Sequence, residues 1–168
     1  ITKQDADRIR AFAGSGLVVS LVAPVTTGAV FRDGSLDNSI ITHEYTHGIS
    51  NRLTGGPSSV GCLSETMDHE NQEANGMGEG WSDFVALTLT ARPGDTGPKR
   101  RGIGTFAQRE ETNGKGIRDY PYSTDMTVNP LTYNSIQTQP GEHGIGTVWC
   151  TMLWDLYWAL SDEYGWDP

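Results

Sequence analysis

The sequence is poor in several features that mark common protein classes. Its 168 residues include only two cysteines, Cys62 and Cys150, which are far from the Cys-x-x-Cys spacing of zinc ribbons and thioredoxin-like motifs. Basic residues are scarce, with 12 Lys and Arg against 21 Asp and Glu and a formal net charge of −9. A chain this acidic repels phosphate backbones and anionic membranes, so we expect neither a nucleic-acid partner nor a membrane partner.

Long apolar runs are missing as well. The longest, residues 145–160, is too short to span a bilayer of roughly 30 Å and contains Asp155, so it predicts a buried core helix. No basic start with an apolar region behind it is visible, so we expect a processed or excised chain without a signal peptide. The length suits one domain with its own core. Cys62 and Cys150 leave two alternatives open, a disulfide or two buried free thiols.

The most informative stretch is His-Glu-Tyr-Thr-His at residues 43–47. On a helix this pattern places His43 and His47 one turn apart, so that both imidazoles can bind one zinc ion. The same pattern leaves Glu44 facing the water that the metal activates. A pattern of five residues also occurs by chance in unrelated chains, so its interpretation as a zinc site depends on a second motif.

The second motif is Glu-Gly-Trp-Ser-Asp at residues 79–83. Its two acids lie four residues apart, so on a helix both point to the same side. Glu79 can be the third zinc ligand, while Asp83 can accept the free ring N–H of a zinc-bound histidine and fix the orientation of the ring. Two His and one Glu leave the fourth tetrahedral position for water, as in catalytic zinc sites. The two motifs together predict a metallopeptidase.

Periodicity predicts one strand and three helices. Residues 16–23 are apolar and β-branched and predict a strand, and a helix with Ser35 as its N-cap is expected to run to about residue 53. A second helix is expected to begin near residue 78 and a third, the central core element, near residue 143. The region between them, residues 91–133, is expected to be mainly loops. In the first helix four apolar side chains are expected to face the core: Leu36, Ile40, Ile41 and Ile49.

Four long motifs occur in the order HEYTHGISNRLTGGP, GMGEGWSDF, YPYSTDMTVNPLTY and HGIGTVWCTMLWDLYWAL. Together they closely resemble the fungalysin family of secreted fungal zinc metallopeptidases, which belongs to the thermolysin-like group, the gluzincins. The resemblance covers about residues 32–160. It implies an α+β fold that is mainly α-helical in this chain, with a helical zinc-binding catalytic domain at residues 32–168, truncated at its C-terminus. Residues 1–31 are then expected to be part of an N-terminal β-containing region.

Carried over residue by residue, the resemblance implies that His43, His47 and Glu79 are the zinc ligands. It also implies that Glu44 is the catalytic general base. Asp83, four residues after the third ligand, occupies the position that hydrogen-bonds the first histidine in thermolysin-like enzymes.

His143 resembles the histidine that donates to the tetrahedral oxyanion in the same group. Thermolysin-like enzymes support this histidine with an acid several residues upstream, where this sequence has Thr138, Gln139 and Pro140. The support for His143 must therefore come from elsewhere. Tyr133 is a further candidate donor.

The function expected from the motifs and the resemblance is that of a zinc-dependent endopeptidase with one Zn²⁺ per chain. The resemblance further implies protein or peptide substrates with an apolar side chain after the scissile bond, secretion to the extracellular space, and a zymogen with an inhibitory propeptide. Calcium binding stays undecided, because no EF-hand-like spacing occurs.

The sequence bears on two other classes of protein. A metzincin continues HExxHxxGxxH, but Ser50 and Leu53 stand where its Gly and third His belong, which excludes that class. The alternative that stays open is a non-catalytic, zinc-stabilised fragment that acts as an interaction module or an antigen. Zinc binding without cleavage that depends on Glu44 would favour this alternative.

Overall fold

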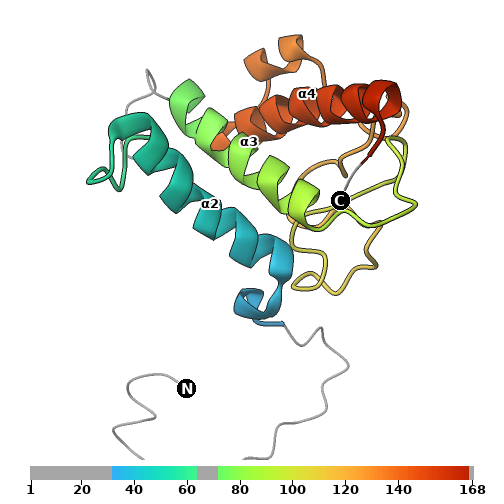
Figure 1. The fold of residues 1–168 in the computed structure, drawn as a ribbon, viewed down its shortest axis with the longest axis horizontal. Coiled ribbons are helices and arrows are strands. Elements are labelled where there is room, and N and C mark those ends of the chain that lie inside the picture. The colour runs from blue at the N-terminus through green and yellow to red at the C-terminus, as the bar shows by residue number, and fades with distance from the viewer. Residues whose placement is uncertain (1–31, 64–71, 167–168) are drawn as a thin grey trace, which may run out of the picture. The chain divides into compact units, whose positions relative to one another are not determined.

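The computed structural model describes residues 32–63 and 72–166. This part of the chain is mainly helical (Figure 1): α2 spans Asn38–Gly55, α3 spans Gln72–Leu89 and α4 spans Gly141–Tyr164. Two short 3-10 helices, η1 at Gly34–Leu36 and η3 at Tyr133–Gln137, precede α2 and α4. The helix α3 packs against both α2 and α4, so α3, and not α4 as the sequence predicted, is the central helix.

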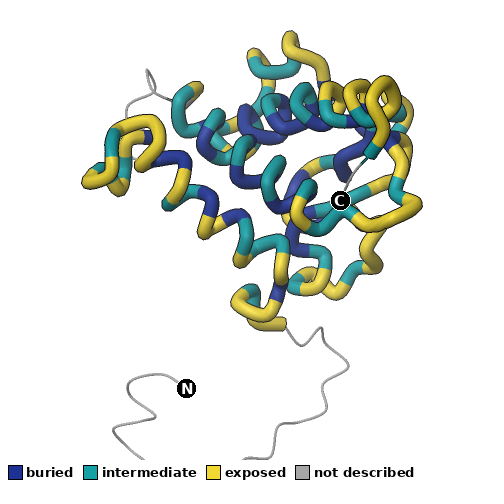
Figure 2. Tube along the Cα trace, viewed as in Figure 1, coloured by how far each residue is buried: buried dark blue, intermediate teal, exposed yellow. Residues whose placement is uncertain are grey.

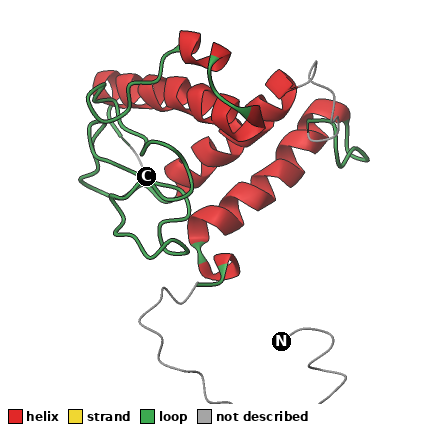
Figure 3. Ribbon diagram, turned by 180° about the vertical axis from the view of Figure 1, so that it is seen from behind, coloured by secondary structure: helices red, strands yellow, loops and turns green. Residues whose placement is uncertain are grey.

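In the sequence, the segment that joins α3 to α4 consists mainly of loops and turns (Figure 3), as expected for residues 91–133. Within residues 32–63 and 72–166, β structure is limited to two isolated bridges, Arg101 with Tyr122 and Ile103 with Gly116. The predicted strand at residues 16–23 and the β-containing region at residues 1–31 lie outside the described residues. None of the described helices is long and apolar enough to cross a membrane.

The helix α2 begins at a different cap from the one predicted. Asp37 is the N-cap, and its carboxylate accepts hydrogen bonds from the backbone N–H groups of Ser39 at 3.0 Å and Ile40 at 3.4 Å. Ser35, the predicted cap, lies instead in η1, where its own N–H donates to Asp33. Asp37 satisfies two of the N–H groups that have no partner inside the helix, which Ser35 is too far upstream to reach.

The two faces of α2 also differ from the prediction (Figure 2). Its buried residues are polar, namely His43, Thr46, Ser50 and Asn51. Leu36, Ile41 and Ile49, expected in the core, are 68%, 48% and 42% exposed. The prediction was wrong because the side of α2 that packs on α3 is the side that carries the two histidines of the HExxH motif, so the apolar positions turn outward.

Glycines allow α3 and α4 to approach closely. A Cβ at Gly80 would lie 2.7 Å from the backbone oxygen of Gly146, and a Cβ at Gly146 would lie 2.5 Å from the Cβ of Glu79. Any larger residue at either position would push the helices apart. This close approach fixes the position of Glu79 along α3.

The core lies between α3, α4 and the loop that joins them. The helix α4, which corresponds to the predicted third helix, is longer than expected. Its residues Leu156 and Leu160 are 55% and 49% exposed, so one side of α4 faces solvent. The helix α3 begins earlier than expected, at Gln72. The main buried cluster combines residues of both helices and the loop: Ala86, Leu87, Ile103, Tyr122, Cys150, Trp154 and Trp158.

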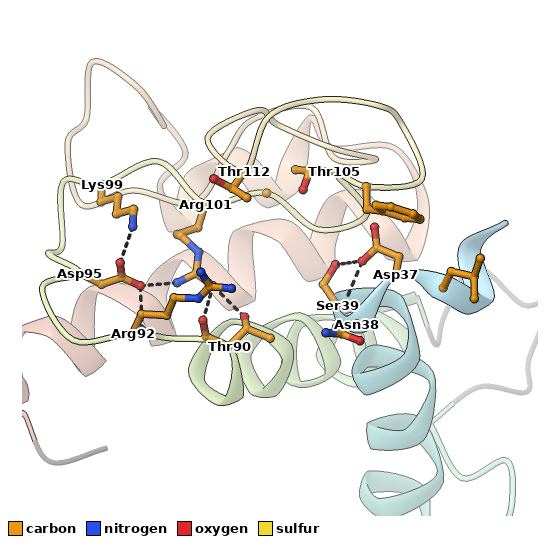
Figure 4. A pocket seen from close by; sticks show the side chains of 13 residues that line it. Asp37, Asn38, Ser39, Thr90, Arg92, Asp95, Lys99, Arg101, Thr105 and Thr112 are labelled. Carbon is orange, nitrogen blue, oxygen red and sulfur yellow. Dashed lines mark hydrogen bonds and ion pairs between the residues drawn. The ribbon is translucent and has the colours of Figure 1, made fainter. Parts of the chain in front are cut away.

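Hydrogen bonds of Arg101 connect the end of α3 to the following loop (Figure 4). Arg101 donates from Nη2 to the carbonyl oxygen of Thr90 at 3.2 Å and to its hydroxyl at 2.7 Å, and from Nη1 to Asp95 at 2.8 Å. Lys99 also pairs with Asp95. These side chains line a pocket of about 340 Å³ beside the start of α2. Since Arg101 and Lys99 are paired with Asp95, we assign this pocket a structural role.

Candidate metal centre

Three side chains from α2 and α3 converge on one point. His43 Nε2 lies 3.0 Å from His47 Nε2 and 3.2 Å from Glu79 Oε2, and His47 Nε2 lies 3.3 Å from Glu79 Oε1. Among the residues that the structure describes, this is the one group of His, Cys, Asp or Glu whose donor atoms all lie within 4.8 Å of one another. The three residues are those that the two sequence motifs single out as ligands.

The geometry of this group fits a zinc ion. Zinc bonds to nitrogen and oxygen of about 2.0–2.1 Å, arranged as a tetrahedron, separate neighbouring ligand atoms by about 3.3 Å. The observed separations of 3.0, 3.2 and 3.3 Å, of which the last two end at different oxygens of Glu79, are close to that spacing. Two imidazoles and one carboxylate are also a donor set found in catalytic zinc sites, where the fourth position stays open.

The helical spacing of α2 produces the histidine pair. His43 and His47 lie four residues apart, and their rings meet edge to face with centroids 4.7 Å apart. His43 is buried and His47 is half-buried, so the pair extends from the protein interior to its surface. The side-chain amide of Asn51, one turn further on, donates to the carbonyl oxygen of His47 at 2.8 Å.

Asp83 binds the ring nitrogen of His43 that points away from the cluster. Its Oδ1 lies 2.7 Å from His43 Nδ1, which leaves Nε2 of the same ring to face Glu79 and His47. Burial opposes a charge on His43, but the hydrogen bonds with Asp83 and Glu79 outweigh it and raise the pKa of His43 to about 9. Burial likewise opposes ionisation of Asp83, but its bonds with His43 and Arg118 lower its pKa to about 2.

Arg118 and Tyr122, two residues of the loop before η3, complete the surroundings of Asp83. Arg118 donates to both carboxylate oxygens of Asp83, from Nε at 2.7 Å and from Nη2 at 2.9 Å, and the Tyr122 hydroxyl donates at 2.5 Å. Burial acts to lower the pKa of Arg118, but the bonds with Asp83 raise it above its usual range. Sequence reasoning missed both residues, although a buried acid such as Asp83 requires a cation and further donors nearby.

Glu79 is surrounded by positive or donor groups. Besides the two histidines, Arg118 Nη2 lies 3.3 Å and His143 Nε2 lies 3.5 Å from its Oε2. Burial raises the pKa of Glu79, but the hydrogen bonds with His43 and His47 outweigh it and hold the pKa well below its usual range. A carboxylate that stays ionised is a suitable ligand for a divalent cation.

The remaining candidate residues differ in their distance from the centre. Glu44 is exposed on α2, directly after His43, and no hydrogen bond or ion pair joins its carboxylate to the residues that the structure describes. His143, in the first turn of α4, faces the centre through Nε2. Tyr133 is 71% exposed at the start of η3.

Neither cysteine belongs to the cluster of His43, His47 and Glu79. Cys62 is exposed and Cys150 is fully buried, and both thiols are free in the structure. Burial raises the pKa of Cys150 well above its usual value, which is typical of an inert core thiol. Of the two alternatives that the sequence left open, the structure therefore has free thiols, of which one is buried.

Comparison with known proteins agrees with this geometry. The family model described as fungalysin metallopeptidase (M36) matches residues 23–168. The chain belongs to this family. It is 51% identical over 134 residues to an Aspergillus niger protein named extracellular metalloproteinase mep, a match that covers 80% of this chain and 20% of that protein. It is 49% identical over 140 residues to extracellular metalloproteinase 2 of Arthroderma gypseum, which covers 83% of this chain and 21% of that protein.

The family assignment confirms the resemblance drawn from the four sequence motifs. A metal-dependent peptidase family also agrees with the cluster of His43, His47 and Glu79. The chain spans about a fifth of the length of the curated relatives it matches. Both relatives therefore have most of their residues outside the matched region.

Proposed function

We propose that this chain carries the catalytic centre of a secreted zinc endopeptidase, with His43, His47 and Glu79 as the zinc ligands. The observation that carries the proposal is the convergence of these three donor atoms within 4.8 Å, with Asp83 bonded to the far side of His43. A cluster that served only as a surface ion pair would not need a buried carboxylate behind one of its histidines.

The donor set supports zinc as the ion. Bound there, zinc would supply Lewis acidity, which lowers the pKa of a coordinated water to about 7. Asp83 keeps Nε2 of His43 directed at the centre, because it occupies the other ring nitrogen. Arg118 in turn keeps Asp83 ionised and in place.

Glu44 is the general base of the proposed mechanism. Its carboxylate lies on α2 directly beside a ligand, is exposed, and is not engaged by another described residue, so it is available to take a proton from the attacking water. The same carboxylate then delivers the proton to the leaving amine. No covalent intermediate with the protein is required.

His143 is the proposed donor to the carbonyl oxygen of the scissile bond. Its Nε2 faces the centre, 3.5 Å from Glu79 Oε2, while 60% of its side chain is exposed and can meet a substrate. A pocket of about 190 Å³ adjoins it, lined by residues that include Arg118, Pro140 and Thr147. This pocket provides room for part of a peptide beside the proposed centre.

The names of the relatives support the cellular setting. Because the Aspergillus niger and Arthroderma gypseum proteins are named extracellular metalloproteinases, we propose that the protein acts outside the cell on protein or peptide substrates. The apolar preference after the scissile bond and the inhibitory propeptide stay part of this proposal, on the strength of the family resemblance.

Zinc content and casein cleavage, measured on the same samples, test the proposed function. We expect one zinc per chain and cleavage that Glu44→Gln abolishes without loss of zinc. Glu163→Gln, which removes an exposed acid at the far end of α4, is the matched control and should leave both unchanged. Bound zinc without cleavage that depends on Glu44 would reject the enzyme for this chain and favour a zinc-stabilised interaction module.

A further inference from the structure

The imidazole of His143 lies between two carboxylates that come from different helices. Its Nε2 is 3.5 Å from Oε2 of Glu79 on α3, and its Nδ1 is 3.6 Å from Oε1 of Glu142 on α4. In the described part of the chain, Glu142 is the acid that the structure places at Nδ1. Each ring nitrogen of His143 therefore faces one carboxylate: Nε2 faces Glu79 at the metal centre, and Nδ1 faces Glu142 on the side away from it.

The pairing of Glu142 with His143 is unusual for two consecutive helical residues. Side chains at positions i and i+1 of a helix do not normally face each other. Here both residues lie in the first turn of α4, directly after Gly141, whose φ of 63° is a left-handed conformation, and no side chain caps the helix. The first turn also favours a negative charge, because the helix dipole is positive there.

The segment upstream offers no other acid. Residues 133–141 read Tyr-Asn-Ser-Ile-Gln-Thr-Gln-Pro-Gly, without Asp or Glu. Gln139, two residues before the start of α4, packs its side chain against Gly144, where a Cβ would lie 3.0 Å from it. Residues 133–141 thus provide no carboxylate for His143, whereas Glu142, directly before it, does.

We propose that Glu142 is the positioning residue of His143: it receives the Nδ1 side of the ring and thereby keeps Nε2 directed at the metal centre. This inference rests on the proposed function, because it assigns a task to Glu142 only if His143 donates to the substrate. The 3.6 Å separation is longer than a hydrogen bond, and contacts of catalytic side chains commonly shorten when the substrate binds.

The effect of Glu142 is expected to be modest. Glu142 and His143 are 45% and 60% exposed at their side chains, so solvent weakens their attraction. Glu142→Leu should lower kcat about three- to tenfold and leave KM unchanged, because orientation of a transition-state donor affects the chemical step and not ground-state binding. Glu142→Gln retains an acceptor oxygen and should recover part of that loss.

The experiment combines kinetics with the orientation of the ring. Wild type, Glu142→Leu, Glu142→Gln and the matched control Glu163→Leu are loaded with zinc, and kcat and KM are measured on one peptide substrate. The χ1 and χ2 angles of His143 are then followed by NMR couplings and NOEs in histidine-labelled protein, in which only four histidines contribute signals. We expect one ring orientation in wild type and in Glu142→Gln, and averaging over several in Glu142→Leu.

Each outcome decides between the claims. A single ring orientation in Glu142→Leu, or a kcat equal to that of the Glu163→Leu control, overturns the role of Glu142 and leaves the proposed function intact. Cleavage that is equally fast in wild type and Glu44→Gln overturns the proposed function itself. Averaged ring orientation together with a lower kcat and an unchanged KM in Glu142→Leu supports both.

Discussion

Arg118 binds the carboxylate of Asp83 through two hydrogen bonds of 2.7 and 2.9 Å, and the two side chains are only 5% and 1% exposed. Asp83 also lies 2.7 Å from Nδ1 of His43. A residue of an irregular loop is thus linked through one buried acid to a proposed zinc ligand on α2. The position of His43 depends on this ion pair as well as on the helix that carries it.

Removal of Arg118 should destabilise the protein strongly. Arg118→Met leaves the buried charge of Asp83 without the guanidinium that makes two of its hydrogen bonds, and breaking such a buried pair typically costs about 3–5 kcal/mol of the free energy of unfolding. Urea unfolding of the zinc-free chain measures this difference. Arg100→Met, which removes an exposed guanidinium, is the control and should change the stability by less than about 0.5 kcal/mol. Equal losses in the two variants would show that the buried pair contributes nothing specific.

Asp83 should control zinc affinity through His43. Asp83→Asn keeps the size of the side chain but removes the charge that orients the ring and increases its basicity, so zinc should bind about 10–100-fold more weakly. A competition titration against a chelator of known affinity measures the change. Asp162→Asn, exposed near the end of α4, provides the control. Unchanged affinity in Asp83→Asn would mean that His43 does not rely on this contact.

The close approach of α3 and α4 should not tolerate a methyl group. In Gly80→Ala the new Cβ would lie 2.7 Å from both the Gly146 oxygen and Cδ1 of Trp149, and such overpacking should lower stability by about 1–3 kcal/mol. Zinc affinity should fall too, because Glu79 would move with its neighbour. In Gly48→Ala the nearest atom is Nη1 of Arg52 at 3.4 Å. This control should be neutral or gain up to about 1 kcal/mol, since Ala favours a helix, and chemical unfolding of both variants tests the contrast.

Asp37 should make the stability depend on acidic pH. Burial raises the pKa of Asp37, but its bonds with Ser39, Ala107 and Ile40 outweigh it, so the pKa lies below its ordinary value. A lowered pKa in the folded state contributes stability above about pH 4, and this contribution disappears as the pH falls through the folded-state pKa.

The variant Asp37→Asn isolates this contribution. Asn caps a helix about as well as Asp, so the variant loses mainly the charge. We expect wild type to be more stable by about 0.5–1 kcal/mol at pH 6 and the difference to shrink below pH 4, as followed by urea unfolding at several pH values. A difference that stays constant from pH 6 to pH 2.5 would contradict the assignment.

The sequence was sufficient to predict which three side chains lie close together in the structure. In HEYTH and EGWSD the spacing of four residues places His43 with His47 and Glu79 with Asp83 on one side of a helix, whatever the surrounding fold. The structure brings the first three within 4.8 Å of one another. Helical periodicity is a local property, and for that reason it can be read from one sequence.

Features that depend on tertiary packing were not predictable in the same way. Arg118 lies in a loop without periodicity, two residues before the motif that begins at Tyr120, and the sequence does not tell which of 12 basic residues neutralises Asp83. The prediction of which side of α2 faces the core was wrong for a related reason. Ile41 and Ile49 would mark the core side of α2 if the burial of apolar side chains decided which side of the helix packs inward. In the structure the side that carries His43 and His47 packs on α3 instead, so Ile41 and Ile49 are exposed.

The zinc-edge X-ray absorption spectrum of the zinc-loaded chain tests the central claim most directly. The account predicts one zinc per chain with only nitrogen and oxygen ligands at about 2.0–2.1 Å, two of them imidazoles, and a loss of this signal in Glu79→Ala. A sulfur ligand at about 2.3 Å, or a spectrum that Glu79→Ala leaves unchanged, would contradict it.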